Sequence, residues 1–260
     1  MGEACLAVLT TADPRAKLML ARRVARDWRA GRLDHRFDVA MPDTPTRPDA
    51  PELLHPNHMP PRRKAGSERG RIALLHAIAH IEFSAIDLAF DLIGRFGEGQ
   101  PRDFVDDWMK VGAEEAMHFA LVDRRLKQMG SHYGALPAHE GLWDAAFDTR
   151  HDFAARLAVV PLVLEARGLD VTPLMISRLR QAGDLPSARI LSRIASDKVG
   201  HVAAGVKWFE KVANLVDFNA PLTFQALVRS HFRGTVKPPF NDSARRQAGL
   251  TREYYTALAH

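Results

Sequence analysis

The sequence predicts an all-α protein built around a bundle of four long helices. Apolar residues recur at the three- and four-residue spacing of amphipathic helices, and no convincing strand pattern appears in the chain. Each of the four predicted long helices also carries an acid or a histidine on its apolar face, where an uncompensated charge is costly. Inward-facing carboxylates and imidazoles are typical of helical bundles that bind metal ions between their helices.

The composition is that of a globular protein with a sizeable core. The chain has 260 residues, of which 46% are hydrophobic and 26% are charged, so one or at most two domains are expected. The single cysteine, Cys5, excludes an internal disulfide framework, and no apolar run is long enough for a membrane span or a secretory signal. We therefore expect a cytoplasmic protein that does not associate with membranes.

The net charge of +5 permits an anionic partner such as RNA. Many soluble proteins are equally basic, and no run of basic residues with interleaved aromatic residues points to nucleic acid. The charge by itself therefore indicates no partner.

The first expected element is a helix from Asp13 to about Trp28. Asp13 suits the N-cap and Pro14 suits the first helical position. Seven prolines between Pro42 and Pro61 then exclude a regular element. This segment predicts an extended strap that lies over the body of the protein.

A long apolar helix is predicted from about Glu68, with Gly94 and Gly97 at its end. Glu82 lies in the middle of its apolar stripe, where a carboxylate needs a cation or a metal ion. His76 and His80 project from other sides of the helix, so we do not expect them to act as ligands.

The next helix begins at Pro101 and is expected to end at Gly130. Its inner face carries Glu115 and His118, which are three residues apart and therefore project the same way. Glu-x-x-His on one helix face is the half-site of helical di-metal proteins. The connector from residue 130 to about residue 150 is long enough for the crossover of a ferritin-like bundle.

The third long helix is expected from about residue 150 to residue 167. Pro161 in its interior predicts a kink just before Glu165. Gly168 is expected to end this helix, and Thr172 with Pro173 to begin a short separate one.

The fourth long helix is expected to start near Pro186, and its inner side carries Asp197, Lys198 and His201. Shorter helices follow after about Val216. The predicted organisation is an N-terminal helix and Pro-rich strap (1–68), a ferritin-like four-helix bundle (69–216) and a C-terminal helical extension (217–260).

A repeated spacing links the two helix pairs of this bundle. Glu82 lies 33 residues before Glu115, Glu165 lies 33 residues before Lys198, and a histidine follows three residues later in each case. In helical di-metal proteins such positions bind two metal ions, with two of the glutamates as bridges. The predicted ligands are Glu82, Glu115, His118, Glu165 and His201, and Lys198 occupies the position of a bridging glutamate.

Two further acids lie four residues before the predicted ligand histidines. Glu114 is expected to accept a hydrogen bond from His201, and Asp197 from His118, across the bundle. Such bonds fix the orientation of a metal-bound imidazole.

Lys198 conflicts with the two-metal template, because three glutamates cannot neutralise two divalent ions and an ammonium. Burial could deprotonate the lysine, or Asp197 could replace it as a shifted ligand. Alternatively, its ammonium replaces one or both metals by pairing with Glu115 and a neighbouring glutamate. We favour the last alternative. Oxygen and imidazole ligands suit iron or manganese, which we expect to be sub-stoichiometric or absent.

The sequence from about Arg62 to Asn241 resembles a bacterial ferritin-like family, domain of unknown function 455. The stretches that carry the resemblance are Leu74–Glu82, Asp107–His118, Pro137–Trp143, Leu164–Pro173, Asp197–His201 and Lys237–Asn241. The resemblance implies a ferritin-like bundle with metal-binding residues at the five ligand positions named above. The family usually reads Asp-Glu-Val-Gly-His at the last metal motif, so Lys198 departs from it at a ligand.

Three functions are compatible with these features. The first is a di-iron-type oxidoreductase, such as a hydroxylase, which acts on a small molecule and receives electrons from a donor protein. The second is a non-catalytic or metal-depleted bundle in which Lys198 forms a buried salt bridge. The third is a tRNA-modifying hydroxylase, because the motif pattern is more distantly similar to a di-iron tRNA hydroxylase. That likeness is one of fold and motif and transfers substrate identity poorly.

Overall fold

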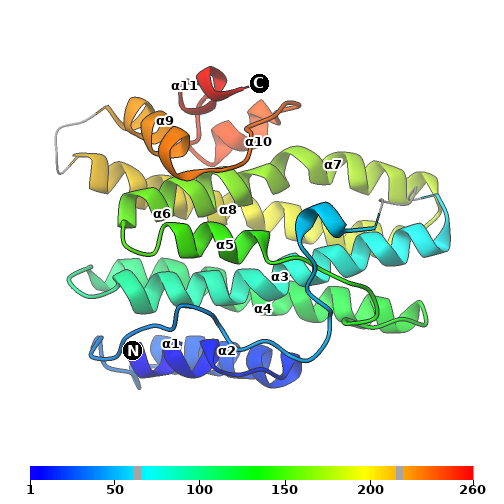
Figure 1. Ribbon diagram of the computed structural model, residues 1–260, viewed down its shortest axis with the longest axis horizontal. Coiled ribbons are helices and arrows are strands. Elements are labelled where there is room, and N and C mark those ends of the chain that lie inside the picture. The colour runs from blue at the N-terminus through cyan, green and yellow to red at the C-terminus, as the bar shows by residue number, and fades with distance from the viewer. Residues whose placement is uncertain (61–65, 215–218, 260) are drawn as a thin grey trace. The chain divides into compact units, whose positions relative to one another are not determined.

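The computed structural model describes residues 1–60, 66–214 and 219–259, and its regular structure is helical (Figure 1). Within these ranges there is no strand, and the only bridges are the isolated pairs Leu53–Ala138 and Val236–Ala259. The predicted all-α class is therefore confirmed. Pro61, at the end of the predicted strap, and the predicted boundary at Val216 lie outside the described residues.

The chain folds as two compact units. The first unit comprises residues 1–143 and 178–190, and the second comprises residues 144–177 and 191–260. The three-part division at residues 68 and 216 stays a prediction from the sequence.

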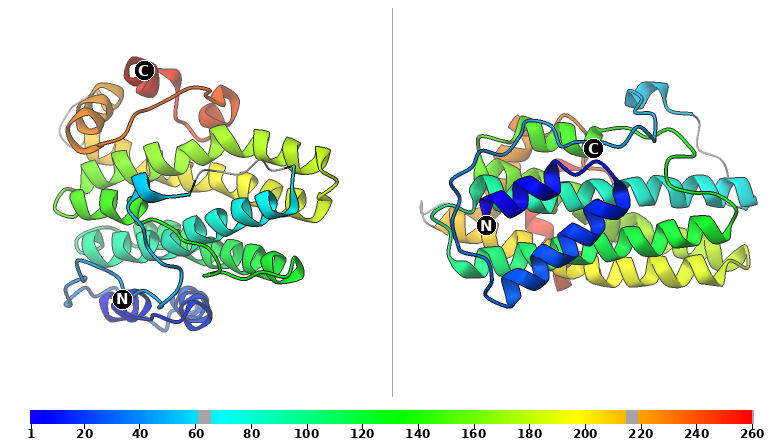
Figure 2. Two further views of the ribbon diagram at one scale, coloured as in Figure 1. Left: turned by 45° about the vertical axis from the view of Figure 1, so that its right-hand side comes forward. Right: turned by 90° about the horizontal axis from the view of Figure 1, so that it is seen from below.

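The first unit is built on the helix pair α3 and α4, with two N-terminal helices against it (Figure 2). Helix α1 packs on α3, and helix α2 packs on α4. The helices that lie within this unit are α1 (Gly2–Leu9), α2 (Pro14–Arg29), the short 3-10 helix Pro56–His58, α3 (Glu68–Phe96) and α4 (Arg102–Gln128). Helix α5 (Gly141–Asp148) continues from this unit into the second.

Helix α2 starts as predicted, because the side chain of Asp13 accepts a hydrogen bond from the Ala16 amide at 2.7 Å. Helix α1 was not predicted. It has no side-chain cap at its N-terminus, and burial of Cys5, Val8 and Leu9 stabilises it instead.

Helix α3 has the length and composition of a membrane span, but 72% of its apolar window is buried inside the protein. It is therefore the core helix of the first unit, as its apolar stripe predicted.

The Pro-rich strap is irregular apart from its 3-10 turn, as predicted, and hydrogen bonds hold it at several points. The Thr46 amide donates to the Leu9 carbonyl at 2.9 Å, the Leu54 amide to the Ala138 carbonyl at 2.8 Å, and the Trp143 indole to the Asp43 carbonyl at 3.0 Å. The strap is thus fixed to α1 and to the connector that follows α4.

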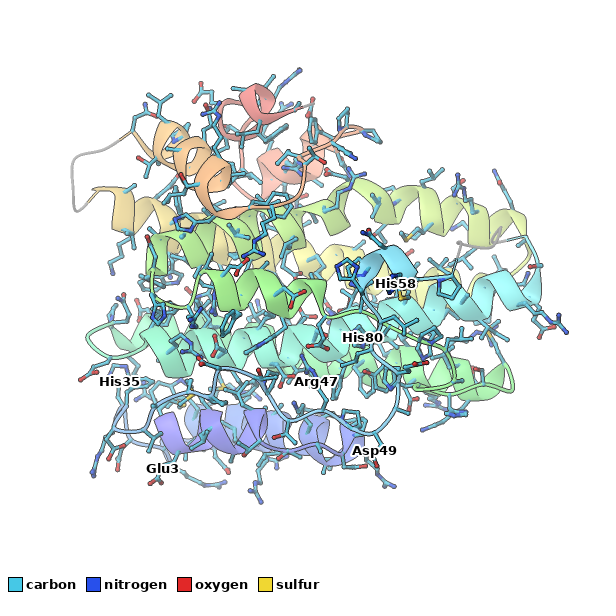
Figure 3. The ribbon with its side chains drawn as sticks, in the orientation of Figure 1. Glu3, His35, Arg47, Asp49, His58 and His80 are labelled. Atoms are coloured by element: carbon cyan, nitrogen blue, oxygen red, sulfur yellow. The ribbon has the colours of Figure 1, made fainter. Side chains whose placement is uncertain are left out.

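A buried charge cluster, made of Lys17, Arg47, Asp87 and Glu140, joins the strap to α2 and α3. The Lys17 ammonium lies 2.5 Å from Asp87, and the Arg47 guanidinium pairs with Asp87 and lies 2.9 Å from Glu140. Arg47 projects from the strap toward the helices that the strap crosses (Figure 3). Two cations and two carboxylates balance one another in this cluster, which limits the cost of burying them.

His76 of α3 is buried beneath the connector. Its Nε2 atom accepts hydrogen bonds from the Gly134 amide at 3.0 Å and the Leu136 amide at 3.4 Å, which requires a neutral ring. Burial, and then the neighbouring His132, lowers the pKa of His76 from 6.5 to about 4.

This depressed pKa predicts a loss of stability in acid. In the unfolded chain the His76 ring binds a proton near pH 6.5, whereas in the folded protein the ring stays neutral down to about pH 4. The free energy of unfolding should therefore fall as the pH drops through this window, with up to about 3 kcal/mol from this one ring. Urea unfolding across the window should show a smaller acid-side loss in His76→Gln than in the parent. The exposed His58→Gln should behave like the parent, and an unchanged loss in His76→Gln would contradict the prediction.

A continuous helix runs from Phe153 to Gln181 and is longer than predicted; its residues up to Ser177 belong to the second unit and its last turn belongs to the first. It consists of α6 (Phe153–Val159), a π-helical segment (Val160–Glu165) and α7 (Ala166–Gln181). The prediction that Gly168 ends a helix was wrong, as was the prediction of a separate helix from Thr172, since Pro173 lies inside α7. Pro161 lies in the π-helical segment, where its missing amide hydrogen leaves a regular α-helical bond unmade, and the predicted kink before Glu165 stays a prediction.

Tertiary contacts explain why the helix continues past Gly168. Leu169 is buried, and the next residue, Asp170, forms a bidentate ion pair with Arg245 at 2.7 and 2.8 Å. Tertiary contacts of this kind outweigh the small preference of a single glycine for ending a helix. The remaining helices described in the second unit are α8 (Leu185–Asn214, whose first turns belong to the first unit), α9 (Ala220–His231), α10 (Asp242–Gln247), α11 (Arg252–Tyr255) and the 3-10 helix Thr256–Leu258.

Helix α8 packs closely on the π-helical segment at Gly205. A Cβ atom on Gly205 would lie 2.6 Å from the Cβ atom of Pro161, whereas a Cβ atom on Gly200 of the same helix would meet nothing within 4 Å. Gly205→Ala should therefore destabilise the protein by about 1–3 kcal/mol through overpacking. Gly200→Ala should instead stabilise it by up to about 1 kcal/mol, because alanine favours a helix interior. Thermal unfolding of the two variants measures both effects, and equal shifts would contradict this account.

Candidate metal centre

A buried cluster of two carboxylates and one imidazole lies between α3 and α4. The Nδ1 atom of His118 is 3.0 Å from an Oε atom of Glu82 and 3.3 Å from an Oε atom of Glu115. The three residues are at most 2% exposed, and one potential ligand atom of each lies within 4.8 Å of the others. The structure thus brings together the three ligands that were predicted on the first helix pair.

The local sequence explains this convergence. Glu115 and His118 are three residues apart on α4, so both face α3. Near this level the two helices approach closely, since a Cβ atom on Gly112 would lie 2.8 Å from the ring of Phe90. Glycine at position 112, one turn before Glu115, therefore leaves room for the Phe90 ring of α3.

The cluster favours a positive charge. Burial lowers the pKa of His118, but the hydrogen bonds and charges of Glu115 and Glu82 outweigh it and raise this pKa from 6.5 to about 10. The protonated Nδ1 donates to both carboxylates. A divalent ion could replace that proton, with a neutral imidazole nitrogen and carboxylate oxygens as its ligands. The donor set therefore fits iron or manganese.

The second unit holds the altered half-site. The Lys198 ammonium lies 2.7 Å from an Oε atom of Glu165, and Lys198 is only 5% exposed. The predicted buried salt bridge of Lys198 is therefore present, with Glu165 as a partner. Its predicted pairing with Glu115 stays a prediction. His201 is also buried and follows Lys198 on α8.

The sequence of the chain matches a family model described as "Protein of unknown function (DUF455)" over residues 10–256. The chain belongs to the DUF455 family. It is also 41% identical over 211 residues to an "Uncharacterized protein" of Haemophilus influenzae, which covers 79% of this chain and 73% of that protein. No solved structure matches the chain. The predicted family membership is confirmed, whereas the ferritin-like and tRNA hydroxylase relationships stay predictions.

In this DUF455 protein the two predicted hydrogen-bond acceptors lie on the expected helices. Asp197 accepts a hydrogen bond from the Arg193 guanidinium at 2.7 Å, a partner that the sequence analysis missed although the two residues are four apart on α8. Glu114 is half-buried on α4. The predicted bonds from Glu114 to His201 and from Asp197 to His118 stay predictions.

The two histidines that were excluded as ligands have other partners in the DUF455 protein. His80 contacts the Tyr133 hydroxyl through Nδ1 at 2.9 Å and the His139 carbonyl through Nε2 at 3.2 Å. Since a carbonyl only accepts, Nε2 carries the proton and Nδ1 accepts from Tyr133. His76 and His80 thus both have hydrogen-bond partners within the first unit, and their exclusion as metal ligands stays a prediction.

Proposed function

We propose that this protein binds one iron or manganese ion through Glu82, Glu115 and His118 and acts as a metal-dependent oxidoreductase. The observation that carries this proposal is the buried Glu–Glu–His cluster, because two carboxylates and a neutral imidazole match the charge and ligand preferences of one divalent ion. The assignment as an oxidoreductase rests on the similarity of the sequence pattern to that of di-metal helical bundles. A hydroxylase of a small molecule in the cytoplasm, supplied with electrons by a donor protein, is the form of this function that the sequence favours.

The residues of the cluster have separate tasks in this proposal. The carboxylates of Glu82 and Glu115 supply negative charge, and His118 supplies a nitrogen ligand once it has lost its proton. The helical spacing of Glu115 and His118 orients both groups before a metal ion arrives. When bound, an iron ion would supply the capacity to bind and reduce dioxygen. Burial of the cluster excludes bulk water from that chemistry.

The second half-site is proposed to be altered. The sequence repeat favours Glu165 and His201 as ligands of a second ion, and that shared centre is a proposal from the sequence. The Lys198–Glu165 ion pair supports a cation in place of metal charge. We therefore propose no more than one metal ion per chain, and less than one as isolated.

The same ion pair favours a second candidate function, a non-catalytic bundle. In that case Lys198 replaces the metal charge permanently, and the protein retains its fold without a metal. Metal binding by the Glu82–Glu115–His118 cluster distinguishes the two candidates.

Titration of metal-stripped protein with Mn²⁺ or anaerobic Fe²⁺ tests the proposal. We expect saturation at no more than one ion per chain and a rise in melting temperature with metal concentration. Glu82→Gln should weaken binding by at least about 100-fold, equivalent to about 2.7 kcal/mol, because it removes a charged ligand. The matched control Glu98→Gln removes an exposed carboxylate of the same unit and should bind like the parent. Equal binding by parent and Glu82→Gln would refute the site, and an absence of binding would favour the non-catalytic bundle.

A further inference from the structure

Four arginines, Arg15, Arg22, Arg23 and Arg26, form an exposed arginine face on α2. All four side chains are exposed, and none makes an ion pair or a side-chain hydrogen bond with a residue that the structure describes. Helical geometry brings them together, since positions 15, 22 and 26 fall in one row and position 23 lies beside it. Their separation in the sequence explains why no basic run was evident.

The other basic residues near α2 have partners, unlike the arginine face. Arg29 donates to the Ala25 carbonyl at 3.3 Å, Arg32 pairs with Asp27 at 2.9 Å, and Arg102 lies 3.9 Å from the ring of Trp28. The acids of α2 are also engaged. Asp13 caps the helix, and Asp27 is the only acid within it. No carboxylate of α2 therefore neutralises the arginine face.

The opposite side of α2 fixes the orientation of the arginine face. Ala21, Val24 and Trp28 are buried, and the buried ammonium of Lys17 is held by Asp87. The helix cannot rotate without breaking these contacts. With a rise of about 1.5 Å per residue, the four guanidinium groups extend along roughly 16 Å of the helix.

We propose that the arginine face binds the phosphate backbone of a nucleic-acid duplex. Guanidinium groups bind phosphate oxygens in a bidentate manner, and a row of unpaired arginines complements a row of phosphates. This inference goes beyond the metal chemistry proposed above and does not depend on it.

The surroundings of the face favour a duplex over other polyanions. Met19, at 59% exposure, is the only large exposed hydrophobic residue on the described α2, so the face lacks the apolar core of a protein interface and the apolar residues that insert into a membrane. The face also carries no aromatic residue on which unpaired bases could stack. Backbone contacts without base stacking indicate binding that is independent of sequence.

Fluorescence anisotropy with labelled RNA and DNA duplexes tests the proposal on the full chain. We expect the logarithm of the binding constant to fall linearly with the logarithm of the salt concentration. Four phosphate contacts should contribute about −3 to −4 to that slope. Replacement of all four arginines by glutamine should remove that contribution and weaken binding by on the order of 100-fold at low salt. Replacement by lysine keeps the charges and should restore most of the binding. The RNA and DNA arms identify which duplex the face prefers.

A control variant removes the same charge elsewhere. Arg124, Arg178, Arg180 and Arg189 are also exposed and make no ion pair or side-chain hydrogen bond within the described residues. Their replacement by glutamine should leave most of the binding intact. An equal loss in both variants would mean that only net charge matters, and would overturn the proposal. Tight arginine-dependent binding of polyglutamate or phosphatidylserine vesicles, without duplex binding, would overturn it in favour of an acidic protein or a membrane.

Discussion

Replacement of Lys198 by glutamate is expected to raise the metal content to close to two ions per chain. The substitution removes the ammonium that lies 2.7 Å from Glu165 and restores the carboxylate that the two-metal template requires. Four carboxylates then neutralise two divalent ions, whereas the parent should hold no more than one. Metal analysis of both proteins, loaded under identical conditions, measures the difference. The variant should also acquire reactivity with dioxygen when loaded with iron.

The same variant should be less stable than the parent when metal is removed. Breaking a buried ion pair leaves an uncompensated charge, which costs about 3–5 kcal/mol. Chelators should therefore destabilise Lys198→Glu strongly and the parent weakly.

Lys198→Met separates the loss of the cation from the gain of a ligand. It should lose stability without binding a second ion. If the parent itself holds two ions, then Asp197 or a neutral Lys198 acts as a ligand, and our account of the altered half-site is wrong.

Asp87→Ala is expected to have the second large effect, a loss of about 3–5 kcal/mol in the free energy of unfolding. Asp87 accepts the buried ammonium of Lys17 and also pairs with Arg47. Its removal leaves one buried cation without its carboxylate and weakens the attachment of the strap. Urea unfolding at neutral pH measures the loss.

A double variant serves as the control for this prediction. Lys17→Met with Asp87→Leu removes one cation and one carboxylate together, while Arg47 keeps Glu140 at 2.9 Å. Apolar residues of similar volume can replace a buried ion pair at little cost, so most of the stability should return. A loss below about 1 kcal/mol in Asp87→Ala would show that water or another group replaces the carboxylate.

The sequence predicted those elements whose signals are local. The Asp13 cap marked the start of α2, and the apolar stripe around Glu82 marked α3. The Glu115-x-x-His118 spacing was enough to place both side chains with Glu82, because a regular helix fixes their direction. Lys198 was singled out because the repeated 33-residue spacing placed it where the two-metal template has a glutamate.

The features that the sequence did not predict depend on contacts between distant residues. Helix α7 continues through Gly168 and Pro173 because Leu169 is buried and Asp170 binds Arg245, which is 75 residues away. Asp87 was not singled out from the sequence, and its partners Lys17 and Arg47 lie 70 and 40 residues away in the chain. The arginine face became apparent only when the buried side of α2 was known.

The anchoring of Arg47 has a consequence for how the chain folds during synthesis. Arg47 leaves the ribosome 40 residues before Asp87 and 93 residues before Glu140. The strap must therefore remain without its partners until α4 and the connector have been made. Its prolines suit this interval, because they disfavour helices and strands that would have to be undone later. We expect the strap to dock late, after the α3–α4 pair has formed. The strap is therefore synthesised before the helices against which it packs.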